Sequence, residues 1–233
     1  MMEVAADPDA AVSGVRDGAT VLIGGFGEAG LPFDLVEALL RNGATDLTVV
    51  SNNAGNGDTG LAALLAEGRV RKIICSFPRQ IDSWVFDRLY RAGAVELELV
   101  PQGNLAERIR AAGAGIGAFY TPTGAGTLLA AGKEVRTIAG RDHVLEYPIH
   151  GDVALIRGHL ADQAGNLVYR KTGRNFGPIM ATAAALTVAE VERVVPLGHL
   201  DPEIVVTPGI FVDRVVVTER RRRPSPAPER SPA

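Results

Sequence analysis

Short apolar runs with strand character recur at regular intervals through the first half of the chain. They cover residues 20–23, 47–50, 72–77 and 95–100. Segments with helical periodicity lie between them. Because a parallel crossover needs a helix to return the chain, this alternation predicts an α/β fold with a mostly parallel sheet and helices on both faces.

The first of these helical segments lies between the first two strands. Phe33, Leu35 and Leu39 fall on one helical face, and Gly43 gives a C-terminal stop. Residues 59–68 form a second helical segment that also closes on glycine. The sequence therefore predicts consecutive βαβ units.

The pattern changes after Val100. Residues 112–127 are dense in glycine and show neither helical nor strand periodicity, which predicts a long surface loop near a site. From Lys133 onward apolar and polar residues alternate, as in a mixed sheet, with one good helix at 174–185. The last residues, 220–233, combine a basic run with Pro and Ser and are predicted to be disordered. The expected organisation is one domain over 1–219 and a tail.

Composition narrows the class of protein. The 233 residues are 46% hydrophobic and carry a net charge of -3, and the basic tail makes the remaining body more acidic. An acidic body argues against nucleic acid as a partner. The single cysteine, Cys75, excludes a disulfide framework, and no stretch approaches the ~18 to 20 apolar residues of a membrane span. We expect a soluble cytoplasmic protein that binds no membrane.

A glycine-rich turn follows the first predicted strand. Gly24, Gly25, Gly27 and Gly30 precede a helix, and such a loop can bring backbone N–H groups close to a phosphate or carboxylate. The glycines alternatively serve only a tight turn. The G-x-G-x-x-G match is weak evidence for a nicotinamide-binding oxidoreductase, because Asp46 precedes a strand instead of ending one.

Polar side chains follow each of the next three predicted strands. In open α/β sheets this carboxyl edge binds ligands. Amides position and polarise a substrate but do not attack it. The alternative interpretation is that Asn and Gln beside Gly only make turns. The side chains at this edge are Asn52, Asn53, Arg79, Gln80, Gln102 and Asn104.

Residues for several common chemistries are missing from the sequence. It has no G-x-S-x-G, H-E-x-x-H, C-x-x-C or Walker motif. Its four histidines lack metal-ligand spacing, and Cys75 reads as a core residue. We therefore expect no metal, and the residues alone indicate a ligand-binding α/β protein with an amide-lined edge.

Several long segments resemble the family I (3-oxoacid) CoA-transferases. Residues 17–32, DGATVLIGGFGEAGLP, resemble the first signature of the family, and the segments expected of its A (alpha) subunit follow in order as far as 217. Those segments are 51–55, 100–127, 165–184 and 201–216. Within the family, residues 76–93 and 175–181 resemble the 3-oxoadipate type more than the succinyl-CoA:acetoacetate type.

The resemblance implies a reaction and a partner. CoA moves from succinyl-CoA to 3-oxoadipate, a step of aromatic-acid catabolism in the β-ketoadipate pathway, through a glutamyl-CoA thioester on a B subunit. No segment here matches the B-subunit nucleophile, so the chain is expected to supply half an active site in an α₂β₂ assembly. It implies no cofactor, since CoA is a substrate.

Site roles follow from the same resemblance. Gln102 is the expected catalytic residue, donating an N–H to the oxyanion, and Asn52 and Asn53 are expected to bind substrate. The expected CoA contacts are Gly24, Gly25, Phe26, Gly27, Glu28, Ala29 and Gly30. Arg79 is a further expectation of ours, because a dicarboxylic acceptor needs a cation for its far carboxylate. A surface arginine or an intersubunit salt bridge is the alternative for Arg79.

Two other functions stay open at this stage. One is an A-type chain whose acceptor is acetoacetate or another short acid. The other is a non-catalytic module that binds CoA or a phosphorylated metabolite. Acceptor preference separates the first from the 3-oxoadipate type, and binding without transfer would indicate the second.

Overall fold

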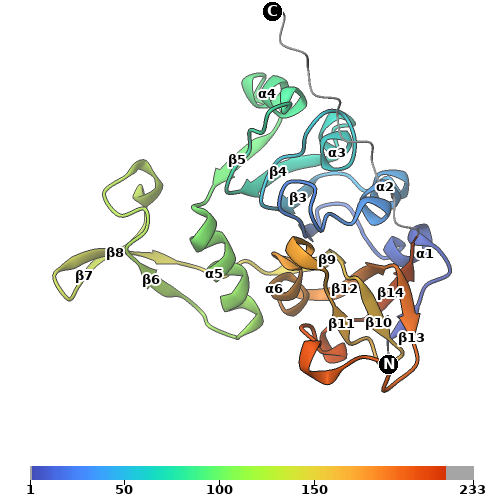
Figure 1. Ribbon diagram of the computed structural model, residues 1–233. Coiled ribbons are helices and arrows are strands. Elements are labelled where there is room, and N and C mark those ends of the chain that lie inside the picture. Colours follow the sequence, from blue (N-terminus) through green and yellow to red (C-terminus); the bar gives the residue numbers. More distant parts are fainter. Residues whose placement is uncertain (1, 219–233) are drawn as a thin grey trace, which may run out of the picture.

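The computed structural model describes residues 2–218, and the tail expected at 220–233 lies outside them. The described part is built on one eight-stranded sheet flanked by helices, with two three-stranded sheets beside it (Figure 1). All neighbours in the large sheet are parallel, in the order β1-β14-β12-β9-β2-β3-β4-β5. These strands are β1 Glu3–Val4, β2 Thr20–Ile23, β3 Leu47–Val50, β4 Val70–Cys75, β5 Glu96–Leu99, β9 Gly151–Arg157, β12 Ala184–Val191 and β14 Arg214–Val217.

Helices cover both faces of this sheet and leave a hydrophobic core on each side. The first core packs against α1 to α4 and the second against α5 and α6. Strand β2 serves both, because Val21 and Ile23 face the first core and Leu22 faces the second. The helices are α1 Pro8–Val12, α2 Phe33–Asn42, α3 Leu61–Ala66, α4 Trp84–Arg91, α5 Gln102–Gly113 and α6 Gly177–Thr182. The predicted three-layer α/β arrangement is confirmed.

Helix α2 shows how the sequence produces one of these elements. Leu35 and Leu39 are fully buried, and each contributes roughly 1.5–3 kcal/mol of hydrophobic stabilisation. The helix ends at Gly43, which adopts a left-handed conformation with φ 87°, as the sequence predicted. Its N-terminus is capped from another part of the chain, since the carboxylate of Glu190 accepts from the backbone N–H groups of Asp34 and Leu35.

The second half of the chain contributes to both kinds of sheet. Strands β9, β12 and β14 extend the parallel sheet, and the antiparallel strand pairs lie in the two small sheets: β10 pairs antiparallel with β11 and parallel with β13, whereas β6-β8-β7 is antiparallel throughout. The apolar run of β9 is buried on both faces, which suits a central parallel strand better than the alternating pattern expected there. The small sheets consist of β6 Phe119–Thr121, β7 Val135–Ile138, β8 Arg141–Glu146, β10 Leu160–Asp162, β11 Leu167–Val168 and β13 Arg193–Val195, and single-turn 3₁₀ helices span Leu128–Ala130, Lys171–Arg174, Pro202–Ile204 and Gly209–Phe211.

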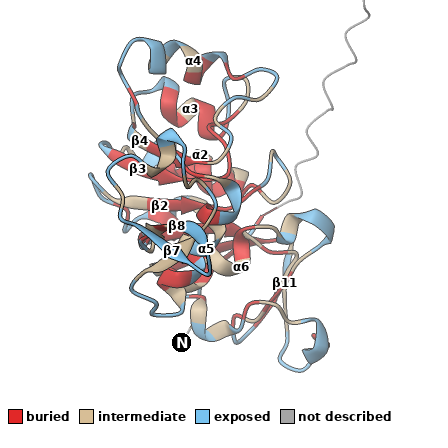
Figure 2. Ribbon diagram, turned by 90° about the vertical axis from the view of Figure 1, so that its left-hand side faces the viewer, coloured by how far each residue is buried: buried red, intermediate tan, exposed pale blue. Residues whose placement is uncertain are grey.

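The glycine-dense segment 112–127 is only partly the loop expected from sequence. It begins inside α5 and continues into β6, the first strand of an antiparallel sheet that projects from the body (Figure 1). Strand β7 of this sheet is exposed along its whole length, in contrast to the buried strands of the large sheet (Figure 2). The end of α5 and the three residues of β6 that fall in this segment are too short to show a helical or strand period in the sequence.

The strand order reverses direction between β2 and β9. From β2 the chain adds β3, β4 and β5 on one side, whereas β9, β12 and β14 lie on the other. The loops that leave the carboxyl ends of β2 and β9 therefore diverge and open a crevice. Such a topological switch point is where open α/β sheets bind ligands.

Candidate functional site

Three uncharged side chains meet beyond the carboxyl ends of β3, β4 and β5. The side-chain oxygen of Asn52 accepts a hydrogen bond from the hydroxyl of Ser76 at 2.8 Å and another from Nε2 of Gln102 at 2.7 Å. We call Asn52, Ser76 and Gln102 the amide edge. The sequence correctly predicted that Asn52 and Gln102 lie at the same edge of the sheet. Ser76, the residue that follows β4, joins them there.

The amide edge is fixed by its own hydrogen bonds. Asn52 is 4% exposed, and its backbone oxygen also accepts from the amides of Ser76 and Phe77. Gln102 is exposed and begins α5, where the first amides have no partner within the helix and the helix dipole favours negative charge. One Nε2 proton of Gln102 bonds Asn52, and a primary amide has a second to offer. The arrangement can donate to an oxygen that gains charge.

Asn53 connects two loops within the protein. Its Nδ2 donates to the backbone oxygen of Gly27 at 3.5 Å, and its Oδ1 accepts from the amide of Gly55 at 2.8 Å. The side chain is 5% exposed. Asn53 therefore positions the glycine loop against the amide edge in this structure, and its expected contact with substrate stays a prediction.

The glycine loop is a tightly folded turn. Phe26 and Ala29 exchange both backbone hydrogen bonds, at 3.0 and 3.1 Å, and the amide of Gly24 donates to Leu155. Gly25 donates to the side chain of Asn175. Because these amides are occupied, the loop is not an open nest of N–H groups, and the phosphate-cradle interpretation has only the remaining amides to use.

Asn175 is a residue that sequence reasoning missed. Its Oδ1 accepts from Gly25 at 3.1 Å, and its Nδ2 donates to the backbone oxygens of Ala29 and Thr172 at 2.7 Å each. It thereby joins the glycine loop to the loop after β11. A Cβ placed on Gly30 would lie 2.5 Å from the backbone oxygen of Gly173, so the two loops touch at a point that only glycine fits.

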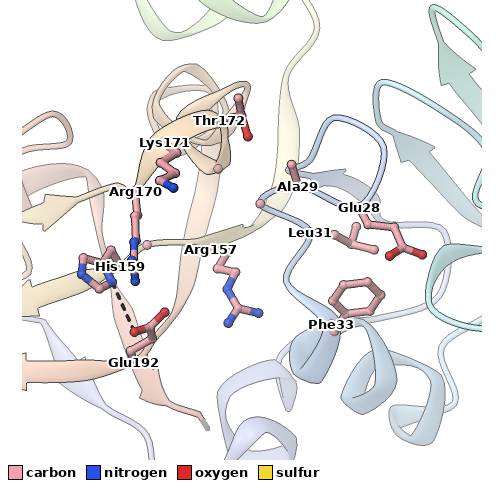
Figure 3. A pocket seen from close by; sticks show the side chains of 13 residues that line it. Glu28, Ala29, Leu31, Phe33, Arg157, His159, Arg170, Lys171, Thr172 and Glu192 are labelled. Atoms are coloured by element: carbon pink, nitrogen blue, oxygen red, sulfur yellow. Dashed lines mark ion pairs between the residues drawn. The ribbon is translucent and has the colours of Figure 1, made fainter. Parts of the chain in front are cut away.

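A pocket of about 360 Å³ opens at the switch point between β2 and β9. Roughly 300–1,000 Å³ is usual for small-molecule sites. We call it the switch-point pocket. Its lining comes from the glycine loop, the ends of β9 and β12 and the loop after β11 (Figure 3). The lining residues are 28–31, Phe33, 157–159, 170–173 and Glu192.

Charged side chains dominate the polar part of the switch-point pocket. Arg157 extends from β9 into the pocket (Figure 3), with its Nη1 2.9 Å from a carboxylate oxygen of the fully buried Glu190. His159 faces Glu192 at 3.3 Å without hydrogen-bond geometry at its Nδ1. Arg170 lines the same pocket from the loop after β11.

Glu190 connects the pocket to the fold. Burial raises the pKa of its carboxyl to about 7, against the lowering effects of the Arg157 guanidinium and of the two backbone amides of α2. The same side chain thus anchors a pocket arginine and the start of a helix. Little in the sequence indicates this role of Glu190, because the residue lies within the apolar strand β12.

A second, smaller pocket lies next to the first. It is lined in part by Gly27, Glu28, Asn53 and Gln80, and it holds about 20 Å³. Glu28 lines both pockets. The glycine loop therefore separates the switch-point pocket from the side of the molecule that carries the amide edge.

Arg79 lies outside both pocket linings. Its guanidinium pairs with the carboxylate of Asp87 on α4, and its side chain is 55% exposed. Asp87 belongs to the same chain, so this pair is not the intersubunit salt bridge considered for Arg79, and the expected contact of Arg79 with substrate stays a prediction. Cys75 is buried in β4, and burial raises the pKa of its thiol to about 12, consistent with the core role read from the sequence.

Two other features of the described residues bear on function. Among residues 2–218, no three His, Cys, Asp or Glu side chains gather as they would around a metal ion. No helix in the same part of the chain is both long and apolar enough to cross a membrane.

Comparison with known proteins identifies the family. The family model for coenzyme A transferase matches residues 5–218. The chain belongs to the coenzyme A transferase family. The resemblance seen in the sequence is thereby confirmed.

Relatives and solved structures agree with this assignment. The chain is 66% identical to the A subunit of 3-oxoadipate CoA-transferase from Pseudomonas putida, over 88% of this chain and 89% of that one. It is 52% identical to the A subunit of succinyl-CoA:3-ketoacid coenzyme A transferase from Xanthomonas campestris pv. campestris strain B100, over 91% and 87%. An acyl-CoA transferase from Escherichia coli O157:H7 shares the fold, with a TM-score of 0.82, 22% identity, and coverage of 93% of this chain but 47% of that one.

Proposed function

We propose that this CoA-transferase chain is the A subunit of a 3-oxoadipate-type enzyme and that, together with a B subunit, it moves CoA from succinyl-CoA to 3-oxoadipate. The choice of 3-oxoadipate as the acceptor rests on the difference in sequence identity: the chain is 66% identical to the relative named for 3-oxoadipate and 52% identical to the relative named for 3-ketoacids. Both relatives are named as A subunits, which supports the proposal that this chain works with a B subunit. We expect an α₂β₂ assembly in the cytoplasm that needs no cofactor.

The proposed reaction needs a nucleophile that the amide edge does not contain. A B-subunit glutamate carboxylate attacks the acyl carbon of succinyl-CoA, the CoA thiolate leaves, and an acyl-glutamyl anhydride forms. The thiolate then attacks the glutamyl carbonyl and releases succinate. The acceptor carboxylate reverses these steps, taking up CoA and freeing the glutamate. The relatives' names as A subunits support a nucleophile supplied by a separate B chain.

Gln102 acts in this scheme on the developing oxyanion. Each attack on a carbonyl carbon places negative charge on its oxygen, and an N–H already aimed at that position stabilises the charge without reorganising. Asn52 holds Gln102 at 2.7 Å, and Ser76 holds Asn52 at 2.8 Å. The amide edge thus supplies a fixed donor, in keeping with the role that the resemblance assigns to Gln102.

An acceptor assay tests the proposal. The chain is co-expressed with its B subunit, and CoA transfer from succinyl-CoA is followed with 3-oxoadipate or acetoacetate as acceptor. We expect kcat/KM for 3-oxoadipate to be at least about 10-fold higher, since a missing polar anchor commonly changes transition-state binding by this much or more. The reverse ranking would assign the chain to the 3-ketoacid type.

The chain without its partner provides the second part of this test. We expect it to be inactive, with binding of CoA at most. Transfer by a preparation free of B subunit would overturn the half-site proposal, and Glu28→Gln would then show whether Glu28 is the nucleophile. Binding of CoA with no transfer in the presence of B subunit would indicate a non-catalytic module.

A further inference from the structure

Two cations in the switch-point pocket have no partner within the described part of the chain. Arg170 and Lys171 both line the pocket, and no hydrogen bond or ion pair joins either side chain to another described residue. Arg157, in contrast, is paired with Glu190 at 2.9 Å. Many surface cations are unpaired, so the significance of Arg170 and Lys171 is that they face a concave site.

The loop that carries these cations is held in place before any ligand arrives. Asn175 accepts from Gly25 on one loop and donates to Thr172 on the other. Lys171 adopts φ 51°, a left-handed conformation that is unfavourable for a side-chain-bearing residue. The backbone from which the two cations extend is therefore held by contacts within the chain.

Within the described part of the chain, the two acids that line the pocket, Glu28 and Glu192, form no ion pair with Arg170 or Lys171. Glu190 is occupied by Arg157 and by the amides that begin α2. Glu192 faces His159 across 3.3 Å. An anionic ligand in the pocket would therefore meet Arg170 and Lys171 as its nearest free charges, with the apolar side chain of Leu31 on the opposite wall (Figure 3).

We propose that the switch-point pocket is an anion subsite of the active site, in which Arg170 and Lys171 bind a terminal anionic group of the substrate. This inference rests on the proposed function, which offers two sources of that chemistry: the far carboxylate of a four- to six-carbon diacid chain and the phosphates of CoA. Arginine can bind either group through two parallel hydrogen bonds. The subsite replaces Arg79 as the anchor for such a group.

Equilibrium binding to the A–B assembly tests the subsite independently of catalysis. Adipate, added without any acyl-CoA so that no transfer can occur, serves as the diacid, and CoA with dephospho-CoA serves as a pair that differs by one phosphate. Calorimetry compares the wild type with Arg170→Gln and Lys171→Gln. The matched control is Arg174→Gln, because Arg174 is an exposed cation of the same 3₁₀ helix that does not line the pocket.

The carboxylate source is identified if Arg170→Gln weakens adipate binding about 10-fold or more while Arg174→Gln does not, as expected for a charged hydrogen bond. The phosphate source is identified if the same variant removes the preference for CoA over dephospho-CoA. Arg170→Lys should restore part of either effect. Unchanged binding of all three probes in both Arg170→Gln and Lys171→Gln overturns the subsite.

Failure of this inference is separable from failure of the proposed function. A wild-type assembly that transfers CoA to 3-oxoadipate, with binding unaffected by both variants, overturns the subsite alone. A wild-type assembly that transfers CoA to neither acid overturns the proposed function, and adipate and CoA binding still decide the subsite.

Discussion

The amide edge and the switch-point pocket lie on either side of the glycine loop and differ in kind. The amide edge is uncharged, and its three side chains are bonded to one another. The pocket is charged, and Arg170 and Lys171 keep no partner among the described residues. A fixed neutral donor suits charge that develops during a reaction, whereas free cations suit charge that a substrate brings with it.

This difference has a kinetic consequence. A group that acts mainly on the transition state lowers kcat when removed, whereas removal of a group that binds substrate and transition state equally raises KM. Variants of the amide edge should therefore change kcat, and variants of the pocket should change KM. If variants of the amide edge and variants of the pocket both changed kcat and KM to the same extent, the two regions would form one site.

Removing the amide of Gln102 should have the largest effect. Gln102→Ala should lower kcat about 100-fold in the A–B assembly, because a lost oxyanion donor costs roughly 3 kcal/mol of transition-state stabilisation. The KM for succinyl-CoA should change less than about threefold. Steady-state kinetics measure both, with exposed Gln163→Ala as the control. Near-normal turnover would reduce Gln102 to a turn residue.

Gly30 tests the junction between the two regions. Its φ of 76° and the 2.5 Å approach of a Cβ to the Gly173 oxygen both oppose a side chain. Gly30→Ala should lower the free energy of unfolding by about 2 kcal/mol or more and displace the loop after β11. Gly27→Ala has a similar φ of 60° but nothing within 4 Å, so it should cost only about 1 kcal/mol.

Thermal unfolding of both glycine variants, in complex with the B subunit, measures this difference. Equal shifts in Tm would show that the contact between the loops of Gly30 and Gly173 contributes nothing. A larger shift for Gly30→Ala, accompanied by weaker ligand binding, would show that the glycine loop sets the position of the pocket cations.

The amide edge could be predicted from sequence for a physical reason. Asn52 and Gln102 each follow a short apolar strand within a few residues, and parallel strands bring their carboxyl ends to one edge. Strands β2 and β3 were predicted with the bounds they have, Thr20–Ile23 and Leu47–Val50. Their apolar runs are sharply delimited, so local pattern and tertiary position agree.

The switch-point pocket could not be predicted in the same way. Its parts come from strands that are neighbours in space but distant in sequence: Gly25 bonds Asn175, 150 residues away, and Arg157 bonds Glu190, 33 residues away. The mixed pattern of the second half concealed that β9 and β12 join the parallel sheet. Without that strand order, nothing marks Arg157 as the arginine of a crevice.

Glu190 allows the pocket side to be tested through pH. Burial raises the pKa of this carboxyl from 4.5 to about 7 in the folded protein. Between these values the folded form retains a proton that the unfolded form has lost. Its stabilising contribution is therefore complete below about pH 4.5 and falls as pH rises through 7, by on the order of 3 kcal/mol.

Glu190→Gln should remove this dependence, because an amide does not titrate. The Tm of the wild type minus that of the variant should be more positive at pH 5 than at pH 8. Exposed Glu67→Gln should show no such trend. A difference that grew with pH would mean that Arg157 and the α2 amides outweigh burial and keep the carboxylate ionised.

Substitution of Arg79 should have the smallest effect on catalysis. A small effect would show that the surface around Arg79 is not a third functional region beside the amide edge and the switch-point pocket. The Arg79 side chain is 55% exposed and pairs with Asp87 on α4, and exposed pairs of this kind contribute about 0–1 kcal/mol. Arg79→Gln should leave kcat/KM for 3-oxoadipate within about twofold of the wild type, since neither the pocket nor the amide edge loses a contact. Arg170→Gln, assayed beside it, should raise KM for the same acid. If Arg79→Gln instead raised KM for 3-oxoadipate about 10-fold and spared acetoacetate, the far carboxylate would bind beyond β4, and the switch-point pocket would lose that role.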